Sequence, residues 1–221
     1  MYNDHKTQIQ NTNTIIAPNG IINGSSLLAK WFPRVHCNVF ISHSHKDQKL
    51  AIALAGWLYD TFKLVSFIDS CLWGYIGDLS KMIDDKYCLH DGSYDYNELQ
   101  QSNAHIHMIL NMALMQMIDD TECLFFLNTP SSLNLNDIGT STCSPWIYYE
   151  LGISNVIRRR TPHRFRSVQK SFSNMNESLV MKHKVSLSHL SKVTVSDLIE
   201  WEGKCCRRTP KEALDYLYEH K

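Results

Sequence analysis

The sequence lacks a net charge, a patterned set of cysteines and a long apolar run. Its 22 basic and 22 acidic residues cancel, which argues against a surface field for nucleic acid or membranes. The seven cysteines form no CxxC pair and no zinc-finger spacing, a usage typical of reduced thiols in a cytosolic protein. The polar start, MYNDHKTQIQNTNT, lacks the apolar core of a signal peptide. We therefore expect a soluble cytoplasmic protein with no nucleic-acid or membrane partner.

What the sequence does contain is an alternation of apolar runs and amphipathic segments. VHCNVFIS (35–42), LVSFID (64–69) and CLFFLN (123–128) are rich in residues typical of buried parallel strands. Residues 47–63 have helical periodicity, so the spacing favours a strand–helix–strand crossover and an α/β fold. Further helices are predicted over 25–32, 78–88, 104–119 and 209–221.

Other segments are less clearly patterned. LHDGSYDYNELQQSN (89–103) is polar and resembles an insertion more than a helix or strand. VSLSHL (185–190) is predicted as a strand, and SDLIEWE (196–202) as a strand or a helix. The run IRRRTPHRFRSVQK (157–170) carries six basic residues and no acid. We rank a solvated helix end first for this run, a phosphate site second and a nucleic-acid surface last.

SPWIYYELG (144–152) places a carboxylate, that of Glu150, where an apolar face is predicted. Ser144 is a good helix N-cap and Pro145 suits the first helical position. The stripe expected to face the core consists of Trp146, Tyr149, Ile153, Val156 and Ile157. Glu150 falls inside that stripe, and a buried carboxylate costs free energy unless it is compensated. An arginine of residues 158–166 would compensate it, and so would a ligand.

Three stretches together resemble a TIR (Toll/interleukin-1 receptor) domain, particularly the Thoeris-like forms of bacterial anti-phage defence. NVFISHSHKD (38–47) resembles the first strand and its loop, and FIDSCLW (67–73) the second strand and the BB loop. SPWIYYELG matches the W-x-x-x-E pattern of the catalytic glutamate in NAD-cleaving members. The resemblance covers residues 35–158. Two features depart from the family: the link over 85–121 is longer than usual, and the basic run stands where a fourth strand is expected.

The resemblance implies a flavodoxin-like parallel sheet with helices on both faces. The TIR-like domain would span 35–221, after an N-terminal extension over 1–34, with helical additions at both ends. In this family the second strand lies beside the first, and the third lies on the first strand's other side. A crevice then opens at the carboxyl ends of the strands.

The same resemblance implies an NAD+ glycohydrolase or ADP-ribosyl cyclase or transferase with Glu150 as the catalytic residue. The nucleotide-binding residues that it implies are Ser42, His43, Asp47, Asp69, Trp73 and Trp146. Nicotinamide leaves readily, so one carboxylate at the ribose is the expected equipment. We expect no metal and no cofactor beyond NAD as substrate. His43 and His45 stand in a loop without an evident third ligand.

Structural roles stay open for several of these residues. Trp73 and Trp146 would equally pack in a core, and Asp69 would equally hold the BB loop through backbone N–H groups. Two other functions also stay open: a non-catalytic adaptor that acts by self-association, and a deoxyribosyltransferase-like glycosidase. The resemblance implies self-association and a separate effector protein that responds to an ADP-ribose-derived product.

Overall fold

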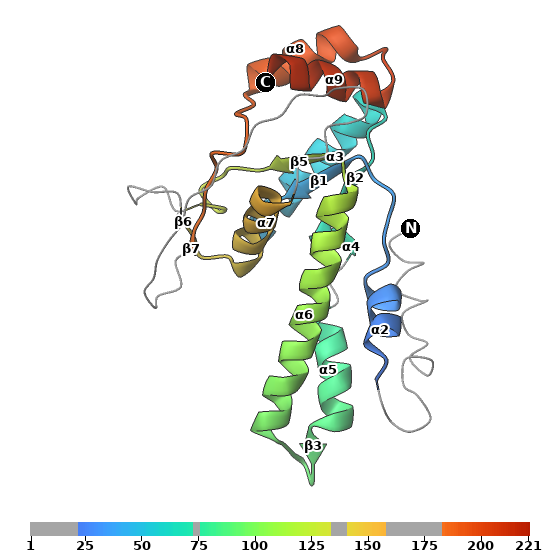
Figure 1. The fold of residues 1–221 in the computed structure, drawn as a ribbon, viewed down its shortest axis with the longest axis vertical. Helices are drawn as coiled ribbons and strands as arrows, with labels where there is room; N and C mark the ends of the chain where they lie inside the picture. Colours follow the sequence, from blue (N-terminus) through green and yellow to red (C-terminus); the bar gives the residue numbers. More distant parts are fainter. Residues whose placement is uncertain (1–21, 73–75, 134–140, 158–182) are drawn as a thin grey trace. The chain divides into compact units, whose positions relative to one another are not determined.

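The computed structural model describes residues 22–72, 76–133, 141–157 and 183–221 (Figure 1). The chain divides into two compact units: Met1–Val35 with Ile68–Met117, and His36–Phe67 with Ile118–Lys221. Trp73 and the basic run at 158–170 lie outside the described residues. Within the described part of the chain, no helix is long and apolar enough to cross a membrane.

The second unit is built on a three-stranded parallel sheet flanked by helices, so the predicted mixed α/β class is confirmed. Its strands are β1 (Val39–Ser42), β2 (Ser66–Phe67) and β5 (Cys123–Phe126), in the order β2-β1-β5. This is the expected order, and β1 is fully buried between its neighbours. The strands are shorter than predicted, and β5 is only half-buried, which corrects the expectation of a third buried strand. Among the described strands, β5 pairs with β1 alone.

Helix α3 (Gln48–Phe62) forms the crossover from β1 to β2, as its periodicity predicted. Two C-terminal helices, α8 (Val195–Cys205) and α9 (Pro210–His220), belong to the same unit. The ring of Trp201 in α8 stacks on Phe62 with 4.1 Å between centroids. Its indole Nε1 donates to the Ala213 carbonyl of α9 over 2.7 Å. Trp201 therefore joins the terminal helix pair to α3, and the segment 196–202 is a helix.

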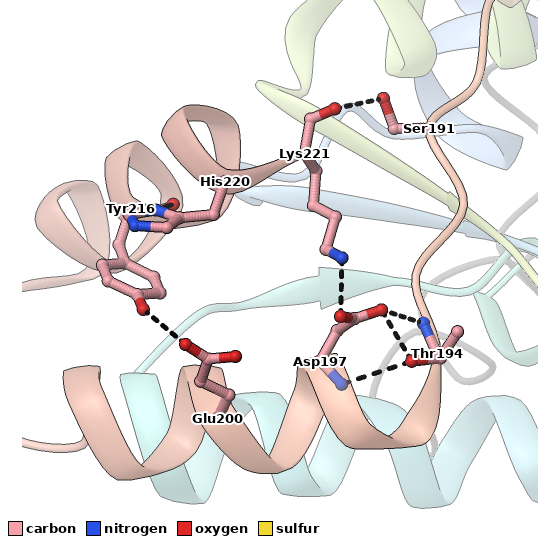
Figure 2. Close-up of polar contacts among 7 residues, drawn as sticks. All are labelled: Ser191, Thr194, Asp197, Glu200, Tyr216, His220 and Lys221. Atoms are coloured by element: carbon pink, nitrogen blue, oxygen red, sulfur yellow. Dashed lines mark hydrogen bonds and ion pairs between the residues drawn. The ribbon is translucent and has the colours of Figure 1, made fainter.

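Both terminal helices begin with reciprocal capping contacts. Thr194 and Asp197 form a capping box at α8, and Thr209 and Glu212 form one at α9. Figure 2 shows that Asp197 also pairs with Lys221, whose Nζ lies 2.6 Å from Oδ1. The contact with Lys221, and then those with Thr194, hold the pKa of Asp197 well below its usual value. The hydrogen bonds from Thr209 likewise lower the pKa of Glu212.

The described residues of the first unit form helices and one hairpin. Its elements are α2 (Gly24–Trp31), α4 (Asp69–Leu72), α5 (Ile76–Tyr87), β3 (Leu89–His90), β4 (Ser93–Tyr94) and most of α6 (Tyr96–Asp120). Figure 1 shows α5 and α6 side by side, and the Ser102 hydroxyl of α6 donates to Asp84 of α5 over 2.6 Å.

The expectation of an unstructured polar insertion over 89–103 was wrong. Strands β3 and β4 pair antiparallel around Asp91 and Gly92, which have φ angles of 50° and 84°. Asp-Gly is a strong hairpin signal because both residues tolerate positive φ. The Asp95 carboxylate then accepts the N–H groups of Asn97 and Glu98, so α6 starts eight residues earlier than the predicted 104.

The strand predicted over 185–190 was also wrong. Strand β7 is His183–Lys184, and it pairs antiparallel with β6 (Ser141–Thr142). Residues 185–190 form a turn and irregular backbone, although Val185 is buried. Strand β6 leads within three residues into α7 (Pro145–Val156), which begins at the predicted N-cap, Ser144.

Candidate functional site

A buried hydroxyl and a buried carboxylate meet at the carboxyl end of β1. Ser42 is the last residue of β1 and has no exposed surface, and Glu150 of α7 is 2% exposed. The Ser42 Oγ–H donates to Glu150 Oε2 over 2.5 Å. A hydroxyl-to-carboxylate bond this short is charge-assisted, which makes it stronger than a bond between neutral groups. The two predicted residues thus form a pair although 108 positions separate them in the chain.

Helix α7 holds Glu150 in place through its cap and through its apolar neighbours. The Ser144 side chain accepts the Ile147 N–H, and Thr142 Oγ1 accepts the Ser144 N–H. Ile147 and Leu151 flank Glu150 on the buried face. They form an apolar cluster with Leu133 and Val185, against which Phe126, Leu187 and Leu190 also pack. The Glu150 carboxylate therefore stands between two apolar residues on the buried face of α7.

The buried face of α7 is not the predicted stripe. The structure buries Ile147, Glu150 and Leu151, whereas Val156 is 66% exposed and Trp146 is half-buried. Apolar residues occur around most of this helix, so their spacing alone does not single out one face. Glu150 was expected on the buried side and does lie there. Burial also raises the pKa of the neighbouring Tyr149, whose phenol therefore stays neutral well into the alkaline range.

The loop after β1 brings two more predicted residues to this end of the sheet. His43 is buried, and its Nδ1 lies 3.2 Å from the Ile41 carbonyl. Since a carbonyl only accepts, Nδ1 carries the proton of this contact. The loop continues into a 3₁₀ turn, η2 (His45–Asp47), and His45 is exposed. Asp47 closes this turn and stands directly before α3.

Asp47 contacts the loop that follows β5. The Thr129 Oγ1 lies 2.5 Å from Asp47 Oδ2 and 3.2 Å from the Ser132 Oγ. Thr129 Oγ1 also accepts the N–H groups of Ser131 and Ser132. Ser132 is 2% exposed, so its side chain is buried. Sequence reasoning missed Thr129 and Ser132, although T-P-S-S directly after a strand is a recognisable turn signal.

The remaining predicted site residues are placed as follows. Trp146 lies on α7, one turn before Glu150, and is half-buried. Asp69 begins α4, which belongs to the first unit, and is not among the residues that the second unit brings together. The predicted arginine partners of Glu150 at 158–166, like Trp73, lie outside the described residues. Their roles stay predictions.

Two further observations concern ligands. Among the described residues, no group of three or more His, Cys, Asp or Glu side chains could hold a metal ion. An open hollow of about 560 Å³ lies along α5 of the first unit, lined by Asp78, Lys81, Met82, Asp85 and Lys86. It contains none of the predicted site residues, and its lining comes from one helix.

The conjunction of Ser42, His43, Asp47 and Glu150 in one unit is what the structure adds to the motifs. No protein-family model, curated protein or solved structure matches this chain.

Proposed function

We propose that this chain is a TIR-like enzyme that cleaves the bond between nicotinamide and ribose in NAD+, with Glu150 as the catalytic residue. The observation that carries the proposal is the Ser42–Glu150 hydrogen bond of 2.5 Å at the carboxyl end of the central strand. Open parallel sheets bind ligands at this end, where the chain winds in opposite directions from a central strand. The motif resemblance and the strand order β2-β1-β5 support a flavodoxin-like, TIR-like sheet.

The chemistry needs one carboxylate. When the glycosidic C–N bond breaks, its electron pair leaves with nicotinamide, which becomes neutral, and positive charge develops on the ribose. An ionised Glu150 stabilises that charge, mainly in the transition state. Water then supplies the oxygen that bonds to the ribose carbon and loses a proton. If a hydroxyl or ring nitrogen of the substrate attacks instead, the product is a conjugated or cyclic ADP-ribose.

The Ser42 hydroxyl contributes by orienting the carboxylate. Its hydrogen bond to Oε2 limits how far the carboxylate can turn. The same contact therefore restricts the direction of the other oxygen, Oε1. Because Ser42 ends a strand that is buried on all sides, the donor itself is fixed. A catalytic group held by packed neighbours loses little rotational freedom when substrate binds.

The direct test is incubation of the full chain with NAD+ and identification of products by mass spectrometry. Glu150→Gln keeps the shape of the side chain and its acceptor for Ser42 but removes the charge. Loss of one such electrostatic stabiliser costs on the order of 10²–10³ in rate, so nicotinamide release should fall by that factor. Glu200→Gln, an exposed glutamate of α8, is the matched control and should release nicotinamide at the unaltered rate.

Protein concentration and substrate belong in the same experiment. TIR-like function includes self-association, so nicotinamide release per molecule should rise with protein concentration. A deoxyribonucleoside in the substrate set distinguishes a deoxyribosyltransferase-like glycosidase, which would cleave it in preference to NAD+. Equal nicotinamide release by the unaltered protein and by Glu150→Gln would contradict the catalytic assignment.

A second function, a non-catalytic TIR-like adaptor, is favoured by one observation. Glu150 and Ser42 are almost fully covered and already bonded to each other, which is what a structural pair requires. An adaptor would release no nicotinamide at any concentration, and Glu150→Gln would assemble like the unaltered protein. The enzyme, in contrast, must open this region for the ribose to reach the carboxylate.

The cellular role belongs to the same proposal. A bacterial anti-phage function would have the chain either deplete NAD+ or make an ADP-ribose-derived signal. A separate effector protein that binds the product would then carry out the response. Product identification separates these two, because depletion needs only ADP-ribose and signalling needs a distinct cyclic or conjugated form.

A further inference from the structure

We infer that Asp47 and Thr129 form a clamp between the loops after β1 and β5, and that this clamp positions Glu150 for the reaction. The inference rests on the proposed function for its kinetic part. It assigns Thr129 a role that the motifs did not predict. It also assigns Asp47 an action through Thr129 instead of a contact with the nucleotide.

The loops after β1 and β5 begin at neighbouring positions of the sheet. β1 and β5 are parallel neighbours with Ser42 paired to Phe126, and the Leu127 N–H donates to the Ser42 carbonyl over 2.9 Å. Both strands thus end at the same level, and their loops start side by side. Asp47 and Thr129 stand five and three residues beyond these two paired positions. Their side chains meet at 2.5 Å.

The Thr129 hydroxyl makes hydrogen bonds both to Asp47 and to the turn that follows Thr129. A threonine hydroxyl has one proton and two acceptor sites. The proton goes to Asp47, since its Oδ2 lies at 2.5 Å, closer than the Ser132 Oγ at 3.2 Å. The oxygen accepts the N–H groups of Ser131 and Ser132, each at 3.2 Å. One oxygen therefore ties the Asp47 loop to the turn that follows Thr129.

The turn that follows Thr129 packs against α7, the helix that carries Glu150. The N–H groups of Ser132 and Leu133 both donate to the Thr129 carbonyl, at 3.0 and 3.1 Å. Leu133 is 2% exposed and packs with Ile147 and Leu151. These two residues stand three positions before and one position after Glu150 on the buried face of α7. Removing the clamp should therefore loosen the surface against which Glu150 is held.

The kinetic test uses Thr129→Val, which keeps the side-chain shape but has no hydroxyl. A displacement of about 1 Å in a reacting group can cost on the order of 10² in rate, so kcat for nicotinamide release should fall by up to about 100-fold. KM should change far less, because the clamp does not touch the substrate. Thr129→Ser restores the hydroxyl and should restore kcat.

Thr121→Val is the matched control. The Thr121 hydroxyl is half-buried and donates to the Ile118 carbonyl over 3.0 Å, two residues before β5 begins. It lies at the amino end of the strand, whereas Thr129 lies beyond the carboxyl end. Thr121→Val removes one half-buried hydroxyl just as Thr129→Val does, and it should leave kcat and KM unchanged.

Asp47→Ala removes the acceptor of the Thr129 hydroxyl, and this variant remains available if Thr129→Val does not fold. It should lower kcat with little change in KM, and the double variant should be no worse than the poorer single variant. A contact of Asp47 with the nucleotide would instead raise KM in Asp47→Ala alone, and the two losses would multiply. That pattern, or a Thr129→Val protein with unaltered kcat, overturns the clamp.

A structural readout keeps the clamp separate from the proposed enzyme. Hydrogen exchange of the amides at 147–151 should be faster in Thr129→Val than in Thr121→Val or in Thr129→Ser. If the unaltered protein cleaves no NAD+, the proposed function fails, and this exchange measurement still decides the clamp. Equal exchange over 147–151 in Thr129→Val and Thr121→Val overturns it.

Discussion

Two kinds of carboxylate–hydroxyl contact occur in the second unit. Asp197 bonds to Thr194 at the exposed start of α8 (Figure 2), and Glu212 bonds to Thr209 at the exposed start of α9, each partner three residues earlier. Glu150 bonds to Ser42, 108 residues earlier, in a buried position. The distances are similar, 2.7 and 2.8 Å against 2.5 Å. The surroundings differ completely.

The difference separates local stabilisation from long-range placement. A capping carboxylate satisfies backbone N–H groups that a helix start leaves unpaired, and solvent keeps its charge inexpensive. A buried carboxylate must be compensated by its neighbours, and an apolar pair of the same volume would often be as stable. The capping pairs are therefore explained by the stability of their helices. The Ser42–Glu150 pair calls for a further reason, and the proposed reaction supplies one.

Ser42→Ala should have the largest effect on both stability and turnover. It removes one donor of a buried carboxylate, which costs about 1–3 kcal/mol of unfolding free energy. If the same amount is lost in the transition state, nicotinamide release falls roughly fivefold to 150-fold. Urea denaturation and an NAD+ turnover assay on the same preparation measure both. Ser154→Ala on α7, whose hydroxyl donates to the Leu151 carbonyl, is the control and should keep its turnover. Unaltered turnover in Ser42→Ala would make the pair purely structural.

Thr194→Ala should affect stability only. It removes an N-cap side chain and one half of a capping box, a loss worth about 1 kcal/mol. Nicotinamide release should stay at the unaltered rate, because α8 contributes no predicted site residue. Thermal unfolding and turnover, measured together, check this. Thr194→Ser keeps the N-cap side chain and should have the same melting temperature as the unaltered protein. A drop in turnover with Thr194→Ala would show that this cap affects the candidate site.

The smallest expected effect is a pH dependence of the exposed carboxylates. Contacts with Lys221 and Thr194 lower the pKa of Asp197 below its usual 3.8, and those with Thr209 lower that of Glu212 below 4.5. Because both pKa values are depressed in the folded state, their contribution is complete above the unfolded values. It is lost as the pH falls through the folded ones.

Melting temperatures of the unaltered protein and of Asp197→Asn with Glu212→Gln should therefore differ most near about pH 6, and the difference should shrink as the pH falls below about 4 toward the depressed pKa values. A gap between the two proteins that stays constant over this range would show that the charges of these carboxylates contribute nothing.

The contrast between local and long-range contacts also explains what the sequence could predict. Thr209 with Glu212 is a local pattern, and α9 was expected where it occurs. The burial of Glu150 and the order of the strands were expected too. The hairpin at Asp91 and Gly92 was missed although its signal is local. The contact of Asp47 with Thr129 joins residues 82 apart, and no periodicity encodes such a distance. The prediction of which face of α7 is buried was wrong for a related reason, because packing against Leu133 and Val185 selects that face.

The separation of Ser42 from Glu150 also imposes an order in time during synthesis. A ribosome adds about 5–20 residues per second, so Ser42 exists for on the order of 5–20 s before Glu150 is made. The 107 residues between them include β5 and the turn at Thr129. No nascent or truncated chain that ends before α7 contains the pair. Under the proposed function, incomplete chains therefore cannot consume the NAD+ of the cell that makes them.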